Sequence, residues 1–196
     1  MKTLFAFLTT LLFCYQAELS AQTLLDSTLT STIAQKKLIE GYKKKYERKI
    51  ILLAKVPGKK SLVKVVNQKW PDETEVSYNI LKDTAGRIRY ITQSPVSESG
   101  DWDIAYDHYF DENGNTIAFY AIESIFDDNV KGGIVRKSLL KYYDADFKPL
   151  KQINSLSDVK FRPIKKSKQE FNFKDDKYVI YKDVTACLKG YNVILK

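Results

Sequence analysis

The chain contains two patterns of apolar and polar positions, one typical of a helix and one typical of strands. From about residue 28 to residue 49, apolar side chains recur about every four positions with lysines between them, which predicts a helix with one apolar face. The apolar positions are Leu29, Ile33, Leu38, Tyr42 and Tyr46. The apolar run 50–54 either extends this helix or begins a strand, and Pro57 and Gly58 end it in both cases.

A period of two appears from about residue 61 onward and predicts antiparallel strands. Every second residue from Trp102 to Phe110 lies on one predicted face, and all are aromatic or aliphatic except His108. The segment Thr116–Phe126 is apolar on both faces, which marks it as a central strand with a covering layer on each side.

Short polar turns that begin with aspartate separate the predicted strands. Asp83 and Asp111 are each followed three positions later by glycine, as in a type I turn that closes a hairpin with a positive φ angle. Phe147 replaces the glycine after Asp144, so we expect a different turn there. With Asp175, these aspartates recur about every 30 residues. The spacing is consistent with successive hairpins in a meander, and equally with a coincidence among ordinary hairpins.

Two of the turns follow an aromatic–aspartate pair and precede an apolar strand, namely Phe110-Asp111-x-x-Gly114 and Tyr143-Asp144. In this respect they resemble the tyrosine–aspartate repeats of exported Rhs-type proteins. The resemblance covers a few residues in each copy, and the turn at Asp83 lacks the aromatic residue. It implies a hairpin architecture and carries no catalytic residues.

These patterns predict an α+β fold in which an N-terminal basic helix packs on an antiparallel β-meander sheet of successive hairpins. The helix and the sheet each have an apolar face that needs covering, so we expect them to pack together. The second face of the sheet is then covered by sheet curvature or by the segment Ser155–Glu170. We expect one domain over residues 22–196, with the helix at about 28–49 and strands from about residue 61 onward.

The first 21 residues have the organisation of a secretory signal peptide. Lys2 precedes an apolar stretch from Leu4 to Tyr15, and a polar stretch that ends at Ala21 follows. A membrane span needs roughly 20 apolar residues, more than this stretch contains. Cys14 lies inside the apolar stretch without the small residues that precede an acylated cysteine. We expect cleavage after Ala21, export to the periplasm or the cell exterior, and no transmembrane span afterwards; the alternative is an uncleaved helix.

The formal net charge of the chain is +8, and the positive charge is concentrated in one segment. Residues 36–64 contain 11 basic and two acidic side chains, whereas the rest is close to neutral. Such a segment suits an anionic partner: lipid head groups, an acidic polysaccharide or a protein. Export and the lack of an interleaved aromatic platform argue against nucleic acid. The candidate binding residues are Lys36, Lys37, Lys43, Lys44, Lys45, Arg48 and Lys49. The alternative is an ordinary solvated helix face.

Few residues are suited to catalysis. The single histidine, His108, excludes a zinc site built on several histidines, and Cys187 is the only cysteine left after cleavage. Asp103 and Asp107 share a predicted strand face, but residues four apart on a strand are about 13 Å apart. We therefore interpret them as part of a solvated face and His108 as a core histidine, and we assign no catalytic residue, metal or cofactor.

The sequence thus favours an exported, non-enzymatic binding or envelope-associated protein that contacts an anionic partner through the basic segment 36–64. The alternative is a carboxylate-dependent hydrolase that acts on envelope or extracellular polymers, with Asp103 and Asp107 as its acidic groups. A purely structural envelope protein is a third hypothesis.

Export predicts a defined new N-terminus. We expect the protein recovered from the periplasm or the medium of the producing cells to begin at Gln22, because the signal ends in the small residue Ala21. Mass spectrometry of the intact protein and of its N-terminal peptide measures this. Recovery of only the form that begins at Met1 would contradict the prediction.

Overall fold

The computed structural model describes residues 2–165 and 178–195, with the side chains of the first helix from Leu24 onward. In these residues a long helix, a short 3-10 helix, eight strands and a second helix follow one another. They are α1 (Lys2–Lys45), η1 (Glu47–Lys49), β1 (Ile51–Lys55), β2 (Val63–Val65), β3 (Val76–Lys82), β4 (Ile88–Pro95), β5 (Trp102–Phe110), β6 (Thr116–Phe126), β7 (Ile134–Tyr143), β8 (Pro149–Asp158) and α2 (Val184–Gly190). The predicted α+β class is confirmed.

Helix α1 differs from the predicted helix at both ends. It begins well before residue 28 because residues 2–40 contain neither glycine nor proline, the residues that interrupt helices. It ends at Lys45 instead of residue 49, and the backbone becomes extended at Ile50 after the single turn of η1. In the described residues, neither helix combines the length and the apolar character that a membrane span needs.

The strands also begin earlier than the predicted residue 61. β1 starts at Ile51, where the sequence left helix and strand open. Its residues pair antiparallel with β3, and Ile51 lies opposite Ile80. Pairing with β3 therefore determines that this apolar run is a strand, which the pattern of its own residues left open.

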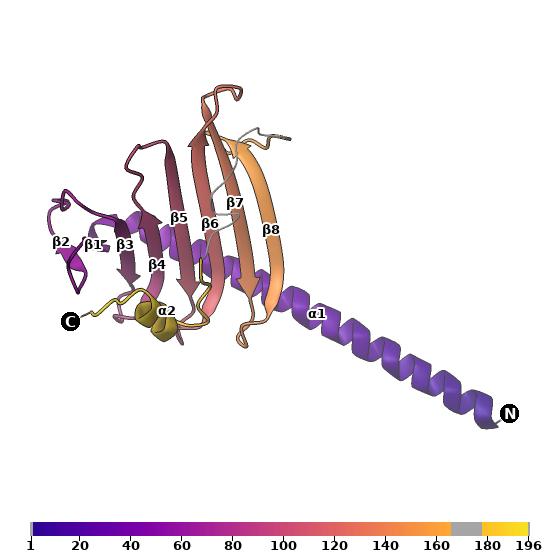
Figure 1. The fold of residues 1–196 in the computed structure, drawn as a ribbon. Helices are drawn as coiled ribbons and strands as arrows, with labels where there is room; N and C mark the ends of the chain where they lie inside the picture. The colour runs from indigo at the N-terminus through magenta and orange to yellow at the C-terminus, as the bar shows by residue number, and fades with distance from the viewer. Residues whose placement is uncertain (1, 166–177, 196) are drawn as a thin grey trace.

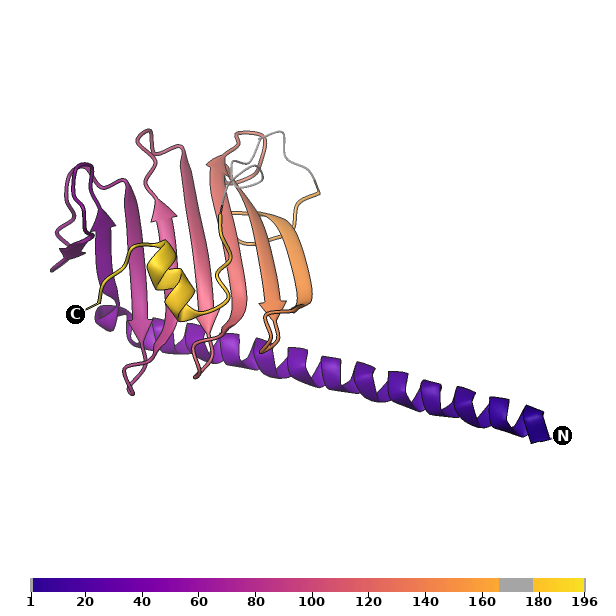
Figure 2. The same cartoon turned by 60° about the horizontal axis from the view of Figure 1, so that its bottom comes forward.

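All eight strands form one antiparallel sheet with the order β2-β1-β3-β4-β5-β6-β7-β8. α1 crosses one face of this sheet and α2 lies against the other, so the sheet is the middle layer (Figure 1). The N-terminal part of α1 runs past the edge of the sheet (Figure 2). β6 lies between β5 and β7 and is covered on both faces, as its two apolar faces predict.

The C-terminal segment covers the face opposite α1. We expected sheet curvature or the segment Ser155–Glu170 there, but the first residues of that segment belong to β8 and its end lies outside the described residues. Instead, the fully buried Cys187 of α2 packs in one cluster with Phe110 of β5. Asp183 holds the start of α2 in place, because its side chain accepts a hydrogen bond from the Ala186 N–H at 2.7 Å.

His108 lies on β5 beneath this C-terminal cover, with no exposed surface. Its Nε2 accepts a hydrogen bond from the Tyr181 N–H at 3.2 Å, and its ring meets that of Phe119 edge-on at a centroid distance of 5.0 Å. Burial lowers the pKa of His108 to about 3, so the imidazole is neutral at physiological pH. The interpretation of His108 as a core histidine is confirmed.

The β3–β4, β5–β6 and β7–β8 hairpins use the same turn. In each, the side chain of the first residue, Asp83, Asp111 or Asp144, accepts hydrogen bonds from two backbone N–H groups of the turn. The expectation of a different turn at Phe147 is wrong. Phe147 takes the glycine conformation with φ 62°, and its ring stacks on Tyr143 at 4.5 Å between centroids, which offsets the backbone strain.

A further turn of this form was not predicted from the sequence. Asp158 begins it, and Phe161 occupies the glycine position with φ 59°. The turn predicted at Asp175 lies outside the described residues.

We expect acid to destabilise the fold through His108, the only histidine of the chain. Its pKa is about 6.5 in the unfolded chain and about 3 in the folded protein, so between these values only the unfolded state takes up the proton. The contribution of His108 to the free energy of unfolding should therefore be constant above about pH 6.5 and fall by up to about 1.4 kcal/mol per pH unit below it. Urea unfolding between pH 8 and pH 4 measures this, with the His108→Gln variant as control. Identical pH dependence in both proteins would contradict the prediction.

Candidate functional site

Helix α1 has a face that packs on the sheet and a face that points away from it, because residues three or four apart share one side of a helix. Thr32, Lys36 and Ile39 lie on the inward face and are buried. The outward face carries small, apolar and basic residues, namely Ala34, Lys37, Leu38, Gly41, Lys44 and Lys45. The predicted binding residues are therefore divided between the two faces.

Two of the predicted binding residues, Lys36 and Lys43, face the sheet. Lys36 Nζ pairs with Glu40 of the same helix and lies 4.5 Å from the ring centroid of Tyr109. Lys43 Nζ donates a hydrogen bond to Tyr90 Oη at 2.8 Å and lies 4.1 Å from the centroid of that ring. Cation–π contacts contribute about 0.5–2 kcal/mol each, more when they are desolvated. These two lysines hold α1 on the sheet and are not free for a partner.

The polar groups beneath Lys43 converge on Asp107 of β5. One carboxylate oxygen of Asp107 accepts hydrogen bonds from Tyr90 Oη at 2.8 Å and from Thr92 Oγ1 at 2.7 Å. Burial raises the pKa of Asp107, and the positive charges of Lys43 and Lys36 oppose that rise. A chain of hydrogen bonds thus connects α1 to β4 and β5.

The interpretation of Asp103 and Asp107 as one solvated face is wrong for Asp107. Asp103 is exposed, whereas Asp107 retains 7% of its accessible surface because α1 covers it. The strand pattern does not reveal a cover that comes from a distant part of the chain. In the described ranges, no group of three or more His, Cys, Asp and Glu residues is placed to hold a metal ion.

The other five predicted binding residues are exposed and form what we call the basic face: Lys37, Lys44, Lys45, Arg48 and Lys49. The Nζ atoms of Lys45 and Lys49 lie 5.3 and 4.8 Å from the ring centroid of Tyr46. Within the described part of the chain, none of the five forms an ion pair with a carboxylate. The segment 36–64 contains two acidic residues, Glu40 and Glu47. Glu40 is paired with Lys36, so within this segment only Glu47 offsets the charge of the basic face.

The remaining lysines of the segment 36–64 lie on and around the β1–β2 hairpin. Lys55 Nζ forms an ion pair of 2.8 Å with Glu75, and Lys59, Lys60 and Lys64 are exposed. The basic segment is therefore not one continuous surface, and the basic face of α1 is its densest part.

A groove of about 570 Å³ lies where α1 passes the turns of the β3–β4 and β5–β6 hairpins. The helix supplies an apolar wall and the turns supply a charged one. The residues of these walls include Leu38, Ile39 and Tyr42 from α1 and Asp83, Arg89 and Glu112 from the turns.

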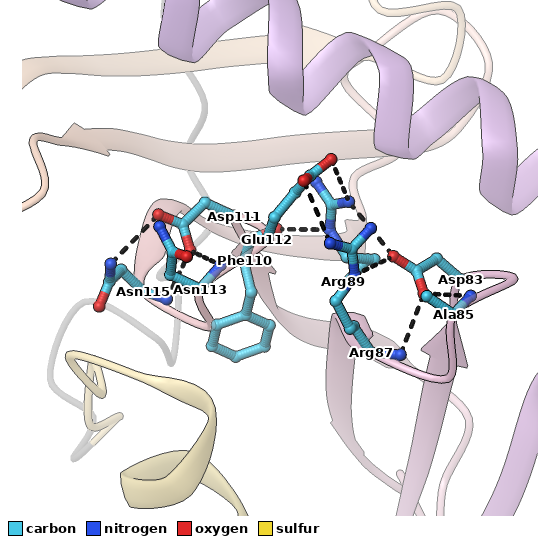
Figure 3. Close-up of polar contacts among 9 residues, drawn as sticks. All are labelled: Asp83, Ala85, Arg87, Arg89, Phe110, Asp111, Glu112, Asn113 and Asn115. Carbon is cyan, nitrogen blue, oxygen red and sulfur yellow. Dashed lines mark hydrogen bonds and ion pairs between the residues drawn. The ribbon is translucent and has the colours of Figure 1, made fainter.

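Ion pairs occupy the charged wall of the groove (Figure 3). Arg87 donates to Asp83 at 2.8 Å and to Glu112 at 3.1 Å, while Arg89 Nε donates to the Phe110 carbonyl at 3.0 Å. Partial burial raises the pKa of Asp83, but hydrogen bonds from Arg87 and the turn backbone outweigh it and hold that pKa below its usual value. These contacts connect the β3–β4 hairpin to the turn of the β5–β6 hairpin. The pairing of these arginines with Glu112 depends on the sheet register and could not be predicted from the local sequence.

No protein-family model, no curated protein and no solved structure matches the chain.

The two faces of α1 predict different effects for two neighbouring lysines. Lys43→Ala removes the hydrogen bond to Tyr90 and the contact with its ring, so the free energy of unfolding should fall by about 1–2 kcal/mol. Lys44→Ala shortens an exposed side chain and should change it by less than about 0.5 kcal/mol. Urea denaturation of both variants measures the difference. Equal losses would contradict the inward position of Lys43.

Proposed function

We propose that the chain is an exported, non-enzymatic protein that binds an anionic partner through the basic face of α1 and η1. The main support for this proposal is that the lysines are divided between the inward and the outward face of the helix. Lys36 and Lys43 are used in contacts with the sheet, whereas the basic face presents five exposed cations that have no carboxylate partner among the described residues. Clustered charge of one sign attracts and steers a partner of the opposite sign.

The N-terminal sequence supports export. Cleavage after Ala21 leaves the whole inward face from Leu29 to Lys43 in the processed protein, so the contacts that hold α1 on the sheet are retained. In the periplasm or outside the cell, the anionic partners available are envelope lipids, acidic polysaccharides and proteins. Nucleic acid is not expected there.

The hydrolase alternative has less support. Asp107 lies beneath α1 and is hydrogen-bonded to Tyr90 and Thr92, while Asp103 is exposed on the same strand. Paired carboxylates act on a glycosidic bond when they are about 5–10 Å apart on the two sides of a substrate. Two residues four positions apart on one strand, one of them covered by a helix, do not provide that arrangement.

Crosslinking in the producing cells tests the proposed function. The cells are separated into envelope and soluble fractions, and the protein in each fraction is quantified. In the combined variant Lys37→Glu, Lys44→Glu and Lys45→Glu, we expect the envelope-associated share to fall about tenfold or more, because attraction becomes repulsion. The crosslinked species identifies the partner.

A matched control separates the basic face from net charge. Lys131→Glu, Lys160→Glu and Lys189→Glu change the charge equally at exposed positions away from α1. This control should associate like the unchanged protein. Equal association of both variants would contradict the proposed function.

A further inference from the structure

We propose that the anionic partner is an anionic lipid surface, on which α1 lies with Lys37, Lys44 and Lys45 toward the head groups and Leu38 between them. The inference rests on the proposed function, because it names the partner of the same basic face. It also gives a role to Leu38, whose side chain is 73% exposed on the outward side of the helix.

The shape of the basic face suits a surface better than a small ligand. α1 forms the outermost layer on its side of the sheet, so a plane laid against that side meets the helix first (Figures 1 and 2). Small anions and sugars are bound in concave sites that surround them. The outward face of α1 does not surround a ligand, because its hollow beside Leu38 is shallow and mostly apolar, whereas the head groups of a fluid bilayer rearrange around such a surface.

The apolar part of the outward face is placed for shallow insertion. Ala34 and Gly41 lie about one turn on either side of Leu38, and a Cβ added at Gly41 would meet no atom within 4 Å. Together these residues form a shallow, mostly apolar hollow that is flanked by Lys37 and Lys45. An apolar strip with lysines beside it is typical of helices that lie in a membrane interface.

The predominance of lysine in the basic face also supports a lipid surface. Four of the five residues of the basic face are lysines, and Arg48 is the exception. A lysine ammonium is a compact, hydrated point charge without the planar fork that orients arginine on one carboxylate or phosphate. A cluster of lysines is therefore better suited to a surface that carries many anionic groups than to a single carboxylate or phosphate. Each contributes about fivefold to partition onto an anionic membrane, and added salt weakens the attraction.

Vesicle co-sedimentation tests the lipid surface. The protein is purified in the form that the cells produce after processing. It is mixed with phosphatidylcholine vesicles or with vesicles that are about one third phosphatidylglycerol. We expect partition onto the anionic vesicles to be about a hundredfold higher or more, and to fall as salt is added.

The variants locate the contact on α1. Combining Lys37→Gln, Lys44→Gln and Lys45→Gln should lower the partition about a hundredfold, whereas Lys131→Gln, Lys160→Gln and Lys189→Gln together should change it less than about twofold. Leu38→Ser should lower partition about threefold with all lysines in place, since it removes one apolar anchor. Unchanged urea unfolding of each variant shows that the fold is intact.

The outcomes separate the lipid surface from the proposed function. Equal partition onto neutral and anionic vesicles, or equal losses in the basic-face and control variants, would overturn the lipid surface. If envelope association in cells depends on the basic face but anionic vesicles are not bound, the partner is a protein or a polysaccharide and only this inference fails. If neither depends on the basic face, both proposals fail.

Discussion

The hydrogen bond from Lys43 to Tyr90, continued to Asp107, determines how α1 is rotated about its axis. Apolar contacts are non-directional and tolerate some rotation of a helix on a sheet, whereas a hydrogen bond to a buried hydroxyl does not. Lys36 above the ring of Tyr109 reinforces the same orientation about two helical turns earlier. With these two lysines turned inward, the helical period turns the remaining cations outward. The basic face is thus a consequence of the contact on the opposite side of the helix.

The two covers of the sheet differ in chemistry. On the α1 side, charged and hydroxyl groups are paired within the interface, and hydrogen bonds from Tyr90 and Thr92 offset the cost of burying Asp107 beneath the helix. On the C-terminal side, aromatic rings surround His108, and burial keeps its imidazole neutral. A charged group without a partner would be costly on either side. Charged groups without a partner among the described residues therefore lie at exposed positions, and those of the outward face of α1 are among them.

Predictions succeeded where neighbouring residues decide the structure. The hairpin turns at Asp83 and Asp111 depend on an aspartate and a glycine three residues apart, and both formed as predicted. Phe147 shows the limit of that argument, because stacking on Tyr143 allows a phenylalanine in the glycine position. The candidate site was predicted in part: the segment was identified, but the partners of its inward lysines lie on β4 and β5.

The sequence alone determined the antiparallel strands, most of the hairpin turns, the buried environment of His108 and the concentration of positive charge in residues 36–64. Each depends on the alternation of side chains, on turn residues a few positions apart or on simple composition. Only the tertiary structure decided that Ile51 begins a strand, that Asp107 is buried and that Lys43 faces the sheet while Lys44 faces solvent. The physical reason is the same in each case, because the partner that settles the conformation lies far along the chain.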